Sequence, residues 1–181
     1  MNDVMPQTTG NLGAEIPVQN LIEVQWAIEP ASWMPQDCDI EGWALEVLRS
    51  LDKTGTAHEV CIRLVSKQEI RILNRDFRHV DKTTNVLAFP QAVELDDGRC
   101  LLGDIVICAP VVEAESKAQG KALTAHYAHL VVHGMLHLLG FDHLVETEAE
   151  EMERMEIDIL KSFGVNDPYD EARIPNPKKT R

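Results

Sequence analysis

Residues 101–140, LLGDIVICAPVVEAESKAQGKALTAHYAHLVVHGMLHLLG, contain the signals that decide the fold. Leu101–Cys108 is an apolar run with the length of a buried strand. Pro110 suits the first turn of a helix that Gly120 ends, and Thr124–Leu139 is long enough for a second helix. A strand followed directly by two helices indicates a sheet that is packed by helices.

The sequence on either side of this stretch predicts three more strands and three more helices. Apolar residues at strand or helix spacing mark them. The strands are Leu21–Ala27, Glu59–Val65 and Asn85–Phe89, the last stopped by Pro90, and the helices are Asp39–Leu51, 66–77 and Thr147–Phe163. A turn signal at Asp97-Gly98 indicates that the strands on its two sides pair. We therefore predict an α+β fold, in which a small four-stranded mixed sheet is packed with about five helices.

Length and composition predict one globular domain. The chain has 181 residues, of which 44% are hydrophobic and 26% charged, and these values exclude a wholly disordered chain or a coiled coil. We expect a flexible N-terminal arm over residues 1–20, a single domain over residues 21–165 and a mobile C-terminal tail over residues 166–181.

The sequence carries no signal for a membrane or for export. No apolar run approaches the about 18 residues that a membrane span requires, and no leader pattern precedes Arg49, the first basic residue. The four cysteines include no Cys-x-x-Cys pair, and Cys61 and Cys108 lie in apolar runs typical of the core. We therefore expect a cytoplasmic protein with no membrane contact and no disulfide partner.

The distribution of charge favours a polyanionic partner, although the net charge does not. A net charge of −13 argues against nucleic acid, but residues 49–82 carry a local charge of +3 and the rest of the chain carries −16. This local excess of positive charge in an acidic protein indicates one surface that is suited to phosphates.

The helix over residues 66–77 places basic side chains along one face. Ser66 is suited to cap its start, and Ile70, Leu73 and Phe77 form its apolar face, which anchors it to the core. The basic residues, which recur every three or four positions and continue past the helix, are Lys67, Arg71, Arg75, Arg78 and Lys82. This pattern is typical of a solvated helix face or of a surface that tracks RNA phosphates.

Five of the seven histidines lie between positions 126 and 143. His133 and His137 are one helical turn apart, so both imidazoles can reach one metal ion, and His143 follows a turn at Gly140. Three histidines with an open fourth position are typical of catalytic zinc. We predict one Zn²⁺ per chain on the long helix and the turn after it. A closed structural site with a cysteine as fourth ligand, Cys100 or Cys108, is the alternative, and His126 and His129 are expected outside the ligand set.

The same spacing occurs in the H-E-x-x-H-x-x-G-x-x-H zinc pattern of metzincin proteases, with one difference. Position 134 is glycine, where a protease has the glutamate that acts as general base. Asp142 is a weak substitute, and such an aspartate more often fixes a ligand histidine or caps a turn. The missing glutamate makes a protease the least favoured function.

His133–His143, HGMLHLLGFDH, resembles the H-G-x-L-H-L-x-G-[YF]-D-H motif of the YbeY family of bacterial endoribonucleases. Leu73–Arg78 with Thr84–Pro90, and Leu102–Cys108, resemble two further motifs of that family. The sequence departs from the family at Ala88, where serine is frequent, and at His79-Val80, where glycine and a basic residue are more usual. Neither departure touches the histidine motif.

The resemblance implies a zinc-dependent endoribonuclease that favours single-stranded RNA and acts in 16S rRNA maturation and ribosome quality control, with the small ribosomal subunit as its partner. It implies His133, His137 and His143 as zinc ligands and Arg78 as the functional arginine. Lys67, Arg71, Arg75 and Lys82 are then the candidate RNA-binding residues.

Three functions follow from these patterns. In an endoribonuclease the zinc ion acts on a phosphodiester whose charge Arg78 offsets, and either water or the RNA 2′-hydroxyl attacks. The alternatives are a metal-stabilised ribosome-assembly factor that acts by binding, and the metalloprotease.

Overall fold

The structure, a computed structural model, describes residues 19–142 and 145–170. The predicted arm up to residue 18, the predicted ligand His143 and the predicted tail from residue 171 lie outside the described residues.

Four strands form one mixed sheet in the order β1-β2-β4-β3. They are β1 (Leu21–Trp26), β2 (His58–Val65), β3 (Val86–Glu94) and β4 (Cys100–Cys108). β1, β2 and β4 are parallel, and β3 pairs antiparallel with β4 across the predicted turn. The predicted α+β fold with a four-stranded mixed sheet is confirmed.

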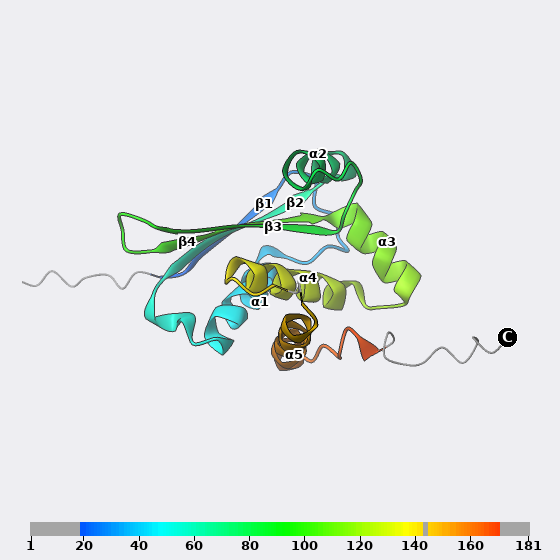
Figure 1. Cartoon of the computed structure of the whole chain (residues 1–181). Helices are drawn as coiled ribbons and strands as arrows, with labels where there is room; N and C mark the ends of the chain where they lie inside the picture. Colours follow the sequence, from blue (N-terminus) through cyan, green and yellow to red (C-terminus); the bar gives the residue numbers. More distant parts are fainter. Residues whose placement is uncertain (1–18, 143–144, 171–181) are drawn as a thin grey trace, which may run out of the picture.

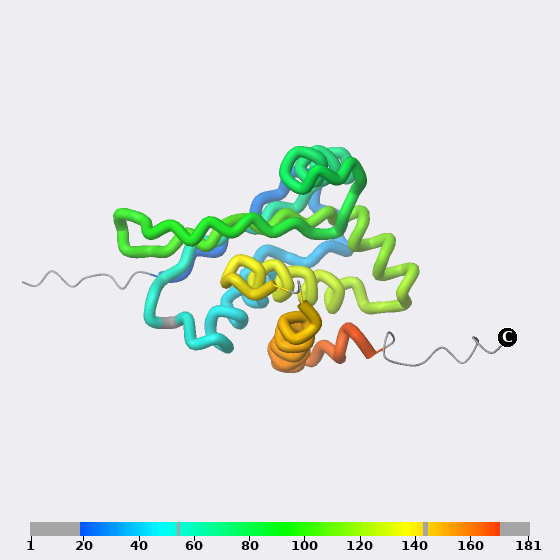
Figure 2. The backbone as a smooth tube through the Cα atoms, viewed as in Figure 1, coloured from blue at the N-terminus to red at the C-terminus, as the bar shows by residue number. Residues whose placement is uncertain are grey.

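Helices cover both faces of this sheet. They are α1 (Asp37–Ser50), α2 (Lys67–Arg78), α3 (Ala109–Gln119), α4 (Leu123–Leu138) and α5 (Glu146–Ser162), with a short 3₁₀ turn at Lys53–Gly55. In Figure 1, α1 and α4 lie against one face, α5 lies beneath α4, and α2 lies on the opposite face. The chain trace in Figure 2 shows the β3–β4 hairpin projecting beyond the helices. No helix in the described part of the chain is long and apolar enough to cross a membrane.

The core lies mainly between the sheet and the layer of α1 and α4. Alternation along β4 sends Ile105 and Ile107 into this core, whereas Val106 and Cys108 enter a smaller cluster under α2. Cys108 is buried, as predicted, but Cys61 is only half-buried, because it points away from the main core on β2. α4 is therefore enclosed by the sheet on one side and by α1 and α5 on others, which fixes the helix that carries the histidines.

The prediction that the third strand stops at Pro90 is wrong, because β3 continues to Glu94. β3 is an edge strand, where the missing N–H of a proline leaves no ladder bond broken. Its register with β4 shifts between Pro90 and Val93, and Ala92 adopts a φ of 56° there. The strand thus absorbs the proline with a bulge.

The prediction that Phe77 anchors α2 in the core is also wrong. Ile70 is fully buried and Leu73 partly buried, but Phe77 is 63% exposed. Its ring meets Phe89 of the edge strand edge-on, with centroids 5.1 Å apart. No further element of the described chain covers the pair, since β3 ends the sheet on this side.

His58 makes the free energy of unfolding depend on pH. The side chain is 6% exposed, and burial, together with the charge of Lys53, lowers its pKa below the ordinary value of 6.5. The unfolded chain therefore takes up a proton before the folded chain does, and the free energy of unfolding falls as the pH falls below about 6.5. We expect His58→Gln to flatten this fall by up to about 1.4 kcal/mol per pH unit. Denaturant unfolding between pH 8 and pH 5, with chelator present, measures it; superimposable profiles for the two proteins would show that His58 does not contribute.

Candidate active site

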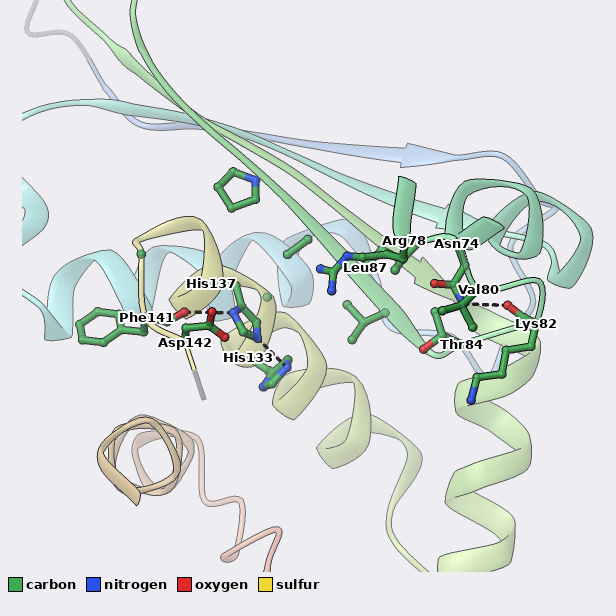
Figure 3. A pocket seen from close by; sticks show the side chains of 15 residues that line it. Asn74, Arg78, Val80, Lys82, Thr84, Leu87, His133, His137, Phe141 and Asp142 are labelled. Carbon is green, nitrogen blue, oxygen red and sulfur yellow. Dashed lines mark hydrogen bonds between the residues drawn. The ribbon is translucent and has the colours of Figure 1, made fainter. Parts of the chain in front are cut away.

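A cleft of about 740 Å³ lies between the C-terminal half of α4 and the loop that follows α2 (Figure 3). His133 and His137 line one wall, Arg78 and Lys82 line the other, and β3 supplies the floor around Leu87. The structure thus brings two of the predicted metal ligands and two of the predicted basic residues into one site.

The two histidines point at each other. Their Nε2 atoms are 3.1 Å apart, as expected for neighbours one turn apart on α4. His133 Nδ1 is 2.8 Å from Glu156 Oε1, and His137 Nδ1 is 3.0 Å from the carbonyl oxygen of Phe141. Because a carboxylate and a carbonyl only accept, each Nδ1 carries a hydrogen and donates it. In the neutral rings the lone pairs are therefore on the two Nε2 atoms.

This arrangement fits a zinc ion. Two lone pairs that face each other at 3.1 Å repel unless a proton or a cation lies between them. Two nitrogens that each lie about 2.0–2.1 Å from a tetrahedral zinc are about 3.4 Å apart, close to the spacing here. A ring nitrogen that donates to a carboxylate or carbonyl while the other binds metal is the usual second interaction of a zinc-bound histidine. A third histidine, His143, is the ligand that the sequence predicts.

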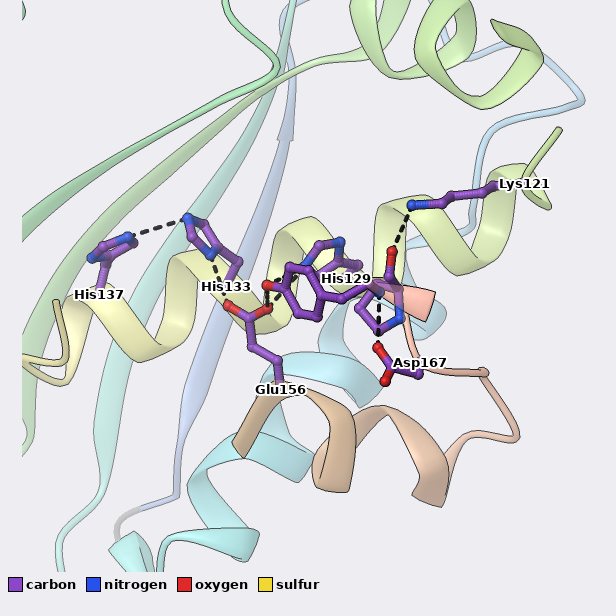
Figure 4. Close-up of polar contacts among 8 residues, drawn as sticks. Lys121, His129, His133, His137, Glu156 and Asp167 are labelled. Atoms are coloured by element: carbon purple, nitrogen blue, oxygen red, sulfur yellow. Dashed lines mark hydrogen bonds and ion pairs between the residues drawn. The ribbon is translucent and has the colours of Figure 1, made fainter. Parts of the chain in front are cut away.

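Glu156 is the site residue that the sequence did not predict. It lies on α5, is 1% exposed, and sits among the buried residues of that helix, Met152, Ile159 and Leu160. Figure 4 shows its carboxylate between His133 and His129, whose Nε2 is 2.8 Å from Oε2. The one available signal was an acidic residue in the apolar stripe of a helix, because buried charges are rare unless they are paired.

The Glu156 carboxylate is held in its charged form. Burial by itself raises its pKa, but hydrogen bonds and charges from His129 and His133 outweigh burial and lower the pKa to about 2. The Tyr169 hydroxyl also donates to it, and burial beside Glu156 raises the pKa of Tyr169, so this hydroxyl stays protonated.

Lys121 Nζ donates to the carbonyl of Pro168 at 2.8 Å, so residues 166–170, which begin the predicted tail, pack on the helical layer.

Loss of Glu156 is expected to weaken metal binding without removing a ligand. In Glu156→Gln, the amide cannot accept from both His129 and His133 as the carboxylate does, so His133 loses its fixed orientation and tautomer. We expect zinc affinity to fall about 10–100-fold, as it does when a ligand histidine loses its outer partner. Competition with a chromophoric chelator measures this affinity. His126→Ala is the control that keeps its metal, since His126 Nε2 bonds to Glu115 instead, and equal affinities for Glu156→Gln and the parent would contradict the assignment.

The basic stripe divides into two parts. Arg78 and Lys82 enter the cleft, whereas Lys67, Arg71 and Arg75 are exposed along α2 outside it. Arg71 forms a two-bond ion pair with Asp81 at 2.7 and 2.9 Å, and Arg75 pairs with Asp76 at 2.7 Å. Exposed ion pairs of this kind are weak, so both guanidiniums can exchange their partner for a phosphate.

The loop after α2, which carries Lys82, is held by the end of the helix. His79 ends the helix in the left-handed region, with a φ of 59°, a conformation that glycine adopts more readily than histidine. Asn74 holds the loop at two points. Its backbone carbonyl oxygen accepts from the Val80 N–H at 3.2 Å, and its side-chain Nδ2 donates to the Lys82 carbonyl at 2.9 Å.

Gly134 disfavours the protease arrangement for a steric reason. A Cβ at this position would lie 2.9 Å from Cγ2 of Ile105, so glycine lets α4 approach the sheet. A larger side chain at position 134 would require Ile105 to shift. The histidine spacing of a zinc protease is thus combined with a position that lacks the protease base and leaves little room for it.

The cleft combines a histidine pair that could hold a metal ion with a wall of basic side chains, and comparison with known proteins assigns the family. The model of the family "Endoribonuclease YbeY" matches residues 33–164. The chain therefore belongs to the YbeY endoribonuclease family, and membership implies endoribonuclease activity in rRNA processing. The solution structure of TM1509 from Thermotoga maritima is similar in fold, with a TM-score of 0.53 and 22% identity over 89% of this chain and all of that one.

Proposed function

We propose that the protein is a zinc-dependent endoribonuclease that cleaves single-stranded ribosomal RNA in 16S rRNA maturation and ribosome quality control. In this proposal it acts in the cytoplasm on RNA of the small ribosomal subunit. The observation that carries the proposal is the cleft itself, in which a pair of histidines suited to zinc faces Arg78 and Lys82.

The histidines His133, His137 and His143 would hold the ion. Zinc bound there would supply Lewis-acid stabilisation of charge on a phosphodiester. Because three neutral imidazoles bring no negative charge, the ligand set leaves the full positive charge of the ion for an anionic substrate. Glu156 keeps His133 in the tautomer that presents Nε2.

The opposite wall binds and orients the phosphodiester. Arg78 can donate two hydrogen bonds to two oxygens of one phosphate, and Lys82 adds a second positive charge beside it. As negative charge increases on the phosphate during cleavage, the guanidinium is already in place to stabilise it. Neither side chain makes a hydrogen bond within residues 19–142 and 145–170, so both can turn to substrate.

The size of the cleft favours a single strand. A volume of about 740 Å³ is in the range of pockets that take a molecule of drug size, which corresponds to one or two nucleotides. A duplex is too wide to enter a cavity of this volume, whereas a single strand can place one phosphodiester inside it.

The basic residues of α2 outside the cleft, Lys67, Arg71 and Arg75, are expected to bind RNA phosphates at a distance from the cleft. The double variant Arg71→Glu, Arg75→Glu should weaken RNA binding, and each lost contact should reduce the slope of log affinity against log salt by about 0.7 for a single strand. Fluorescence anisotropy at several salt concentrations gives that slope. An unchanged slope would identify the stripe as a solvated helix face.

The direct test of the proposed function is cleavage of a labelled single-stranded RNA with and without chelator. We expect cleavage by the parent protein, loss with chelator, and none by His133→Ala purified in the same way, which controls for contaminating nucleases. RNA binding without cleavage under every condition would favour the assembly factor that acts by binding.

A further inference from the structure

Asn74 presents a fixed hydrogen-bond acceptor inside the cleft. Its side chain is 5% exposed and lines the cleft, and its Nδ2 donates to the Lys82 carbonyl at 2.9 Å. Because that carbonyl can only accept, the orientation of the amide is set and the other atom is the oxygen, Oδ1. Within residues 19–142 and 145–170, no group donates to Oδ1. Oδ1 is not among the fully buried side-chain atoms that lack a partner, and because Asn74 lines the cleft, the donor of a ligand can reach this oxygen.

The position of Asn74 restricts what that ligand group can be. In Figure 3 the amide lies between Arg78 and Lys82, on the wall opposite the histidine pair. Two cations in a nucleic-acid cleft bind phosphates, which offer acceptors and no donors. The unit that joins one phosphate to the next is the ribose, and in an RNA chain its one hydrogen-bond donor is the 2′-hydroxyl.

We propose that Asn74 Oδ1 accepts a hydrogen bond from a ribose 2′-hydroxyl, and that Asn74 is thereby a specificity-determining residue that selects RNA over DNA. This inference rests on the proposed function, because it presumes that a nucleic-acid strand occupies the cleft. It assigns two tasks to one amide: the N–H₂ group fixes the loop that carries Lys82, and the oxygen reads the sugar.

Binding of matched oligonucleotides, measured by fluorescence anisotropy with chelator present so that none is cleaved, tests the proposal. The probes are one single-stranded RNA and the same sequence with 2′-fluoro sugars, which keep an RNA-like sugar conformation but cannot donate. We expect the parent protein to bind the RNA about 3- to 10-fold more tightly, the value of one hydrogen bond. In Asn74→Ala the ratio of the two affinities should fall to about one.

The ratio of the affinities for the two probes distinguishes recognition of the 2′-hydroxyl by Asn74 from a purely structural role of this residue. If Asn74 only held the loop, Asn74→Ala would lower both affinities equally and leave the ratio unchanged, which would overturn the proposal. Lys82→Ala is the matched control, since it should weaken both probes and keep the ratio. Asn74→Leu, which keeps the volume without a polar group, provides the same comparison if Asn74→Ala does not fold. A parent protein that binds neither probe would contradict the proposed function itself, whereas one that binds both equally would contradict only the role of Asn74.

Discussion

Arg78→Ala is expected to slow RNA cleavage by about 10²–10³, the loss seen when one transition-state donor is removed from an active site. The guanidinium lies in the cleft that holds His133 and His137, and it is the basic group at the end of α2 that can donate to two phosphate oxygens. Arg78→Lys keeps the charge but not the paired donors, so it should restore cleavage only in part. Single-turnover cleavage of a labelled RNA measures each rate.

The fold and the metal should survive the loss of Arg78. The side chain is exposed and makes no hydrogen bond within the described chain, and such surface substitutions change the free energy of unfolding by about 0.5 kcal/mol or less. Arg49→Ala is the matched control, because Arg49 is also an exposed arginine at the end of a helix and lies outside the cleft. Metal content and melting temperature of both variants should be measured on the samples that are used for the cleavage assay. Cleavage by Arg78→Ala at the parental rate, or its unfolding with loss of zinc, would show the assigned role to be wrong.

His137→Ala is expected to lose most of its zinc and, with it, RNA cleavage. The ring offers Nε2 toward the position that it shares with His133, and no other side chain can take its place on that turn of α4. Loss of a ligand should cost more than the about 10–100-fold in affinity that loss of an outer partner costs. Elemental analysis after dialysis gives the zinc content per chain.

The fold should tolerate this change better than the metal does. His137 is only partly buried and sits at the rim of the core, so α4 should remain packed against the sheet. His126→Ala, a more deeply buried change on the same helix, should retain its zinc and serves as the control. Full zinc retention by His137→Ala would remove His137 from the ligand set.

The elements and the histidine pair were predictable because their signals are local. The spacing of His133 and His137 fixes their common face on α4, and the alternation along β4 fixes which side chains enter the core. The turn at Asp97-Gly98 likewise predicts the pairing of β3 with β4.

The rest of the site depends on packing between distant segments, which local patterns do not report. Glu156 reaches His133 only because α5 lies beneath α4, and Lys82 reaches the cleft because His79 turns the chain at the end of α2. β3 passes Pro90 because it is an edge strand, a property of the sheet order. Phe77 is exposed for the same reason, since no strand of the described chain lies beyond β3.

We propose that one zinc ion, held by histidines of α4 and the turn after it, is required for RNA cleavage. Titrating chelator-treated protein with zinc, while following bound metal and the rate of RNA cleavage together, tests it most directly. We predict that cleavage returns in proportion to bound zinc and levels off at one ion per chain, and that His133→Ala shows neither. Full cleavage by metal-free protein, or zinc binding at one ion per chain without return of cleavage, would contradict the account.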